Sequence, residues 1–166
     1  CKKSLAKHIL NTGDDDFDFV LLGITSSESQ YRMVSLINDA VGINLFLSDY
    51  LPFSLKDSKV FRFSLYRFSD EELRLEYFFI PNNSNFEEPS SVPVNENAGL
   101  FSGHDVQETV KLIKELPKTD FFLLLKGEDL HHVQFKIAER LKKIEEIVQL
   151  QTIEPHELPS RRNLIF

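Results

Sequence analysis

An uninterrupted apolar run from Phe121 to Leu125 constrains the fold of this chain more than any other stretch. Pro117 and Asp120 precede the run and Gly127 follows it, so turn-forming residues bound it on both sides. Such a run is too short for a typical helix, whereas a strand covered on both faces has this pattern. The sequence therefore predicts a buried central strand over residues 120–126. Alternate side chains along it should pack on opposite faces of the sheet.

The first part of the chain has a β-α-β pattern. We expect a strand over residues 17–24, then a helix, then a returning strand over residues 43–46. Ser27 and Gln30 have the spacing of a capping box, and Gly42 suits the position that follows the last helical turn. Apolar residues recur at helical spacing and should face the core: Tyr31, Val34, Ile37 and Val41.

A second β-α-β unit starts with the apolar run. Asp129 is the expected N-cap of its helix, and residues 147–153 should form the returning strand. The apolar stripe of this helix consists of Leu130, Val133, Ile137, Leu141 and Ile144.

Between the two units, residues 61–66 and 73–79 alternate in polarity around a polar turn, which predicts a hairpin. In its first strand, Phe61, Phe63 and Leu65 should face the core, opposite a second face formed by the residues between them. A further strand is expected over residues 109–113. Two β-α-β units with an intervening hairpin indicate one α+β domain over residues 1–166. Its sheet should be antiparallel and ferredoxin-like, with both helices on one face.

Two segments are expected to lack regular structure. Residues 81–103 are rich in Asn, Ser, Pro and Glu, which predicts a mobile surface loop. Pro155 and Pro159 interrupt the last segment, which predicts an extended tail over residues 154–166. This tail ends in apolar residues and should therefore dock on the domain or on a partner.

The residues around the central strand resemble the motif that names the IPExxxVDY family, small proteins found mostly in Bacteroidota. Ile113, Glu115, Asp120 and Phe121 lie at the spacing of the motif, with Pro117 between them. The sequence departs from the motif at three positions: Lys114, Thr119 and Phe121 replace proline, valine and tyrosine. The resemblance implies a cytoplasmic protein and no particular reaction. We expect a structural role for the motif, with Asp120 accepting backbone N–H bonds at a turn.

Candidate ligand-binding residues lie where each expected helix begins. Thr25 and Ser27 follow the first strand, and Gly127 and Asp129 follow the central strand. If the two loops met, their free N–H groups could hold an anion, although ordinary helix capping explains the same residues. Arg161 and Arg162 are further candidates for a ligand or partner surface.

Two carboxylates enter the expected central strands, Asp18 in the first unit and Asp120 in the second. If they enter at corresponding ends, a paired acidic site is possible. Capping of the strand ends is the alternative interpretation.

Composition disfavours several functional classes. The net charge of -7 opposes non-specific binding to nucleic acid, and the charged residues near Lys136 alternate in sign as on a solvated helix face. The acidic run at residues 14–16 lacks the ligand spacing of a calcium loop, and His104-Asp105 has no nucleophile beside it. His131 and His132 are adjacent, so on a helix they diverge rather than chelate. We therefore expect no catalytic site, no metal and no cofactor.

The only cysteine, Cys1, excludes an internal disulfide framework and begins a Cys-Lys-Lys-Ser sequence like that of a mature lipoprotein. A missing upstream segment is the alternative explanation, and the cytoplasm is the expected location. The leading functional hypothesis is a non-catalytic interaction or accessory protein with a protein partner. The alternatives are a small-molecule-sensing regulatory module and, less favoured, an anchored lipoprotein domain.

Overall fold

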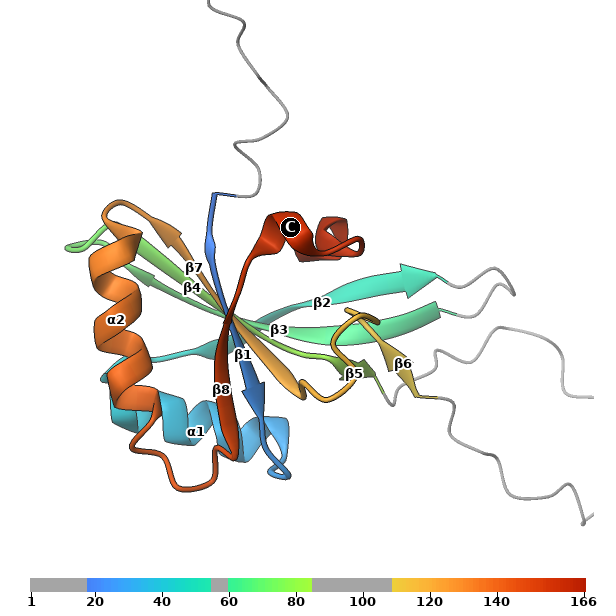
Figure 1. The fold of residues 1–166 in the computed structure, drawn as a ribbon, viewed down its shortest axis with the longest axis horizontal. Helices are drawn as coiled ribbons and strands as arrows, with labels where there is room; N and C mark the ends of the chain where they lie inside the picture. The colour runs from blue at the N-terminus through green and yellow to red at the C-terminus, as the bar shows by residue number, and fades with distance from the viewer. Residues whose placement is uncertain (1–17, 55–59, 85–108) are drawn as a thin grey trace, which may run out of the picture.

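The computed structural model describes residues 18–54, 60–84 and 109–166 (Figure 1). The strands are β1 (Val20–Thr25), β2 (Phe46–Ser54), β3 (Val60–Asp70), β4 (Leu75–Pro81), β5 (Asn83–Ser84), β6 (Val110–Lys111), β7 (Phe121–Gly127) and β8 (Gln149–Ile153). The helices are α1 (Gln30–Val41) and α2 (Leu130–Leu141), followed by the 3-10 helices η2 (Pro155–Glu157) and η3 (Arg161–Leu164).

The main sheet has six strands in the order β2-β3-β4-β7-β1-β8, and every neighbouring pair is antiparallel. β7 and β8 each pair with β1, so α2 connects two strands that run in the same direction with one strand between them. This is the split β-α-β arrangement of ferredoxin-like folds, and the α+β prediction is confirmed. The predicted hairpin is also confirmed, as β3 and β4.

The first β-α-β unit differs from the second in the position of its returning strand. The returning strand β2 begins at Phe46, later than predicted, and lies at the far edge with β3, β4 and β7 between it and β1. The chain then returns to the centre through the β2-β3-β4 meander. In Figure 1 the far ends of β2 and β3 project away from both helices. This extension leaves part of the sheet on the helix side without a helix over it.

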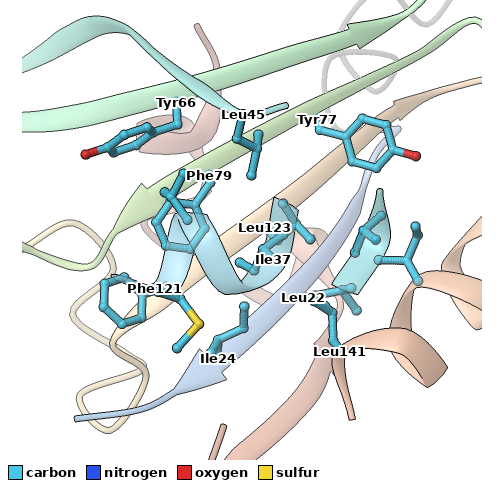
Figure 2. Close-up of a cluster of buried hydrophobic side chains, with 14 of the residues drawn as sticks. Leu22, Ile24, Ile37, Leu45, Tyr66, Tyr77, Phe79, Phe121, Leu123 and Leu141 are labelled. Carbon is cyan, nitrogen blue, oxygen red and sulfur yellow. The ribbon is translucent and has the colours of Figure 1, made fainter. Parts of the chain in front are cut away.

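The central strand β7 is buried along its apolar run, as predicted. Phe121, Leu123 and Leu125 belong to one core cluster, and Phe122 and Leu124 belong to another on the opposite face. We name the first the helix-side core because both helices contribute to it. Its helical members are Met33, Val34, Ile37, Val41, Ile137 and Leu141. Figure 2 shows this core, with Phe79 and Phe121 stacked at a centroid distance of 5.2 Å.

The second cluster, which we name the tail-side core, is covered by short segments instead of helices. Phe61, Phe63, Phe78 and Phe122 are among its sheet members. Leu112, Ile113, Leu158 and Leu164 cover them, from the segment before β7 and from the C-terminal segment. The prediction of an extended tail was wrong, because η2 and η3 turn the chain so that its leucines reach the sheet. The C-terminal segment docks on the domain, as expected.

The helix ends differ from the predictions in detail. Ser29, not Ser27, caps α1, and its side chain accepts the N–H of Arg32. Val34, Ile37 and Val41 are buried as predicted, but Tyr31 is 68% exposed and Met33 is fully buried in its place. Gly42 ends the helix in the left-handed conformation, as expected.

Asp129 occupies the N-cap position of α2, but its side chain makes no capping hydrogen bond. Its backbone is left-handed, with φ of 51°, a conformation unlike the extended one in which an N-cap side chain reaches the first helical N–H groups.

The expected strand over residues 109–113 is reduced to β6, which pairs with β5 in a separate two-stranded sheet. Leu112 and Ile113 lie beyond the strand, where the N–H of Leu112 donates to the Asn82 backbone carbonyl and the N–H of Ile113 donates to the Asn82 side-chain oxygen. Pro81–Ser84 lies within the described part of the expected loop, and residues 85–103 lie outside it. The acidic run at 14–16, His104-Asp105 and Cys1 also lie outside the described residues.

Candidate functional site

A cleft of about 750 Å³ opens on the helix side of the sheet, where α1 begins and the sheet continues beyond it. One wall is the loop from β1 to α1 and the first turn of the helix. Strand residues form the floor. The full lining is Ser26, Ser27, Glu28, Ser29, Gln30, Tyr31, Tyr50, Arg62, Ser64, Pro81, Asn83, Ser84, Asp120 and Phe121.

The wall is fixed by hydrogen bonds to distant parts of the chain. The Asp120 carboxylate accepts the N–H of Ser26 at 2.9 Å, and the Ser26 hydroxyl donates to the Glu146 carbonyl at 2.7 Å. The same hydroxyl accepts the N–H of Glu28 at 3.2 Å. The loop is therefore held in place before α1 starts.

The first helical N–H groups, those of Gln30 and Tyr31, point out of the helix start and have no intrahelical acceptor. Both residues line the cleft.

The floor of the cleft includes polar residues on one face of β3. The sequence pattern did not predict that this face would be buried. Phe61, Phe63 and Leu65 are buried as predicted, but Ser64 and Tyr66 on the other face are buried too, because the strand is covered on both sides. Ser64 is 9% exposed, lines the cleft, and its hydroxyl has no hydrogen-bond partner among the described residues. Ser84 is tied to the floor by its hydrogen bond to the Arg62 carbonyl at 2.8 Å.

Tyr66 adds a second buried hydroxyl on the face of β3 that carries Ser64. Its ring packs edge-on against Phe79, and within the described residues its hydroxyl has no hydrogen-bond partner. Figure 2 shows this hydroxyl at the same end of the core as Phe121, which lines the cleft. Burial, together with smaller contributions from the neighbouring Tyr31 and Tyr50, raises the pKa of Tyr66 to about 12. Tyr66 is therefore neutral and able to donate a hydrogen bond at physiological pH.

Charges of both signs surround the cleft. Glu28 and Asp120 contribute carboxylates, and Arg62 contributes a guanidinium group that also takes part in another interaction. Tyr31 and Tyr50 line the cleft, and 68% and 49% of their surface is exposed. The lining thus combines hydroxyls, opposite charges and aromatic rings.

The motif residues around β7 form a separate hydrogen-bonded constellation centred on Asn82. This side chain is fully buried. Its amide nitrogen donates to the carbonyls of Thr119 at 2.8 Å and Leu116 at 3.0 Å, and its oxygen accepts the N–H of Ile113 at 2.8 Å. Glu115 accepts two hydrogen bonds from Ser160, which ties the motif to the C-terminal segment.

Ile113 and Phe121 lie in the two cores, and Pro117 is exposed between β6 and β7. Because these contacts hold the fold together, they support the structural role predicted for the motif. The role itself stays a prediction.

The two loops expected to form one ligand site lie far from each other. β1 and β7 are antiparallel, so Ile24 pairs with Phe121 and Val20 pairs with Leu125. Thr25 and Ser27 therefore lie at one end of the sheet, and Gly127 and Asp129 lie at the other. Only Ser27 lines the cleft, while Thr25 donates its hydroxyl to the Lys118 carbonyl. The predicted shared site was wrong for this topological reason.

The paired acidic site was wrong for the same reason. Asp18 precedes the start of β1 and Asp120 precedes the start of β7, and these starts are at opposite ends of two antiparallel strands.

The remaining candidates are at the surface. Arg161 donates to the His156 carbonyl at 2.7 Å, and Arg162 is exposed; both border a hollow of about 310 Å³ formed by the C-terminal segment alone. His131 and His132 are exposed on α2. Within the described residues, no group of His, Cys, Asp and Glu could hold a metal ion.

Several cleft residues were not candidates in the sequence: Tyr50, Arg62, Ser64 and Ser84. No local signal distinguished Ser64, because it alternates with the predicted core residues and shares its face with Arg62, as on an ordinary polar face of a strand. Tyr50 and Ser64 are register partners on neighbouring strands, a pairing that only the sheet topology reveals.

The fold and the cleft together define a class: a ferredoxin-like α+β domain with a polar cleft beside the first helix. Comparisons with protein-family models, curated proteins and solved structures found no match to this chain. The resemblance to the IPExxxVDY family therefore stays a prediction. Among the described helices, none is long and apolar enough to cross a membrane.

Proposed function

We propose that this protein is a non-catalytic binding module whose cleft holds a small polar ligand. The observation that carries the proposal is the cleft of about 750 Å³, a volume in the range of ligand pockets, lined by polar groups held on rigid elements. The hydroxyls of Ser26 and Ser84 donate to backbone carbonyls, which are bonds that maintain the shape of the site.

A ligand bound here would contact the first turn of α1 and the central strand at once, because Asp120 joins them. Occupancy of the cleft would therefore stabilise the contact between the two β-α-β units. This coupling is the physical basis for a regulatory role, in which a ligand changes the stability of the domain rather than undergoing a reaction.

The test is a thermal-shift screen of polar metabolites against the wild-type chain and two matched variants. Ser27→Trp places a bulky side chain at the cleft from an exposed position, and Ser35→Trp makes the same change on an exposed helix position outside the lining. We expect at least one compound to raise the melting temperature of the wild type and of Ser35→Trp but not of Ser27→Trp. Equal stabilisation of both variants would contradict a ligand site in the cleft.

A second candidate function, binding to a protein partner, is favoured by the edge strand β2. Phe46, Leu47 and Tyr50 are 56%, 40% and 49% exposed on this strand. Leu47 and Tyr50 lie on one face of the strand and Phe46 on the other, and exposed apolar side chains on an edge strand are typical of interaction sites. Copurification from native cells should then enrich a partner with the wild type, and lose it with Phe46→Ser. Leu73→Ser, an equally exposed leucine in the hairpin turn, is the control and should retain the partner.

The cytoplasm is the location that we propose for this module, on the basis of the family resemblance. Lipid anchoring through Cys1 is the alternative. Cell fractionation combined with metabolic labelling by a fatty-acid analogue separates the two, because an anchored protein would be labelled and would sediment with membranes.

A further inference from the structure

The chemical class of the ligand follows from the hydrogen-bonding groups that the cleft leaves unused. Within the described residues, several hydroxyls of the lining make no hydrogen bond: Ser27, Tyr31, Tyr50 and Ser64. Ser64 is the most informative of them, because it is nine-tenths buried and opens onto the cleft. A bound group that makes a hydrogen bond with this hydroxyl in place of water would gain affinity.

Tyr66 does not line the cleft, but it carries another unused hydroxyl in the helix-side core. Its hydroxyl is buried and lacks a partner among the described residues, and it lies on the same face of β3 as Ser64. Hydroxyl groups both donate and accept hydrogen bonds, so their natural match is a ligand that does both.

The charges of the lining argue against a strongly charged ligand. An anion accepts hydrogen bonds only, and here it would face the carboxylates of Glu28 and Asp120 as well as a chain with a net charge of -7. A cation donates only, and would face Arg62 and the positive end of the α1 dipole. A neutral ligand avoids both conflicts, and its hydroxyls can donate to the carboxylates and accept from the helix N–H groups and the guanidinium.

The two exposed tyrosines complete the pattern. Tyr31 comes from α1 and Tyr50 from β2, so aromatic surface reaches the cleft from both its wall and its floor. Aromatic rings contact the flat C–H faces of ring-shaped ligands and exclude water from the hydrogen bonds around them. The volume of about 750 Å³ accommodates one or two such rings.

From these groups we infer that the cleft takes a neutral, hydroxyl-rich ring, either a free saccharide or the ribose of a nucleoside. The inference rests on the proposed binding function and specifies its ligand. The hydroxyls of Ser64 and Tyr50 bond the ring hydroxyls, the carboxylates of Glu28 and Asp120 accept from them, and the tyrosine rings pack on the apolar face.

The test is titration of the isotope-labelled chain, followed by amide chemical shifts. Maltose and adenosine are the two probes of the inferred class, and inorganic phosphate and glycine are probes of charged classes. We expect maltose or adenosine to shift the amides of residues 26–31 and 62–64 in a saturable way. Response to maltose alone identifies a saccharide, and response to adenosine alone identifies a nucleoside.

Ser64→Ala should weaken this binding by about two- to tenfold, the usual effect of one neutral hydrogen bond. Ser35→Ala, on the exposed face of α1, should leave it unchanged. Tyr50→Phe keeps the ring and loses only the hydroxyl, whereas Tyr50→Ala loses both and should weaken binding more. The spread of amide shifts in each free variant reports whether it is folded.

The outcomes separate the inference from the function that it specifies. If phosphate or glycine shifts the cleft amides and the neutral probes do not, the ligand class is wrong and the binding function stands. If none of the four probes shifts these amides, the inference fails; if the metabolite screen also finds no cleft ligand, the binding function fails with it. Equal binding by wild type and Ser64→Ala would also overturn the assignment of Ser64.

Discussion

At the scale of single residues, Asn82 does most to join separate parts of the chain. Its backbone N–H donates to the Asp120 carbonyl at 2.7 Å, and its carbonyl accepts the N–H of Leu112 at 2.9 Å. Together with the side-chain bonds, these contacts fix the whole segment between β6 and β7. That segment in turn places Asp120 against the loop that forms the cleft wall.

Replacement of Asn82 by alanine should lower the free energy of unfolding by about 2–4 kcal/mol, because it leaves the buried N–H of Ile113 and the Thr119 carbonyl without partners. Urea denaturation followed by circular dichroism measures the change. Asn83→Ala is the matched control, since Asn83 is partly exposed and, within the described part of the chain, its side chain bonds only to Lys111. Equal losses for the two variants would contradict the role given to Asn82.

Tyr66 yields a prediction about alkaline pH. Its pKa is raised from 10.0 to about 12 by burial, so the folded state keeps the hydroxyl proton after the unfolded chain has lost it. A group with a raised pKa of this kind makes stability fall as the pH rises from about 10 to about 12. Tyr66→Phe removes the group and should make this fall shallower.

Near neutral pH, Tyr66→Phe should be as stable as the wild type or slightly more stable, since the lost hydroxyl has no partner among the described residues. Parallel urea titrations at pH 7, 10 and 11.5 provide the comparison. Tyr31→Phe, at a largely exposed position, is the control. A large loss at neutral pH would instead reveal that the hydroxyl is bonded in solution.

At the scale of elements, β7 holds the two cores together. It pairs with β1 on one side and β4 on the other, and its side chains enter both the helix-side core and the tail-side core. The Asp120 carboxylate, directly before β7, accepts the N–H of Ser26 and so ties the β1-α1 loop to this assembly. A destabilising substitution in this strand should therefore weaken the packing on both faces of the sheet.

We expect Leu123→Ala in the helix-side core and Leu124→Ala in the tail-side core each to cost about 2–5 kcal/mol, the usual range for a fully buried leucine. Leu73→Ala, an exposed leucine in the turn between β3 and β4, should cost less than about 0.5 kcal/mol. Guanidinium denaturation measures all three. If Leu124→Ala were as mild as Leu73→Ala, the tail-side core would not be a true core.

At the scale of the whole molecule, the two helices cover one face of the sheet. The segment before β7 and the C-terminal segment cover the other face. Leu158 and Leu164 place the C-terminal segment over the tail-side core, and Phe166 contacts Phe78 at a centroid distance of 5.2 Å. Glu115 and the Leu112 carbonyl hold the same segment through Ser160 and Asn163. This segment therefore replaces the third layer that helices would otherwise supply.

Leu164→Ala should accordingly destabilise the whole domain by about 2–5 kcal/mol, although it lies close to the end of the chain, because its side chain is fully buried. Ile165→Ala, at a neighbouring position that is 41% exposed, should cost much less. Hydrogen exchange of the β7 amides is the decisive measurement. If their protection were the same in Leu164→Ala as in the wild type, the C-terminal segment would be an accessory to the fold and not part of its core.

By itself, the sequence determined the elements whose signals are local. The run from Phe121 to Leu125 predicts a strand buried on both faces, and Gly42 predicts the end of α1, because these patterns depend only on neighbouring residues. The tertiary structure decided what depends on pairing. The antiparallel register of β1 and β7 separated Thr25 from Asp129, and the far placement of β2 brought Tyr50 beside Ser64 at the cleft. Strand order is set by the burial of the whole sheet, and no single segment contains that information.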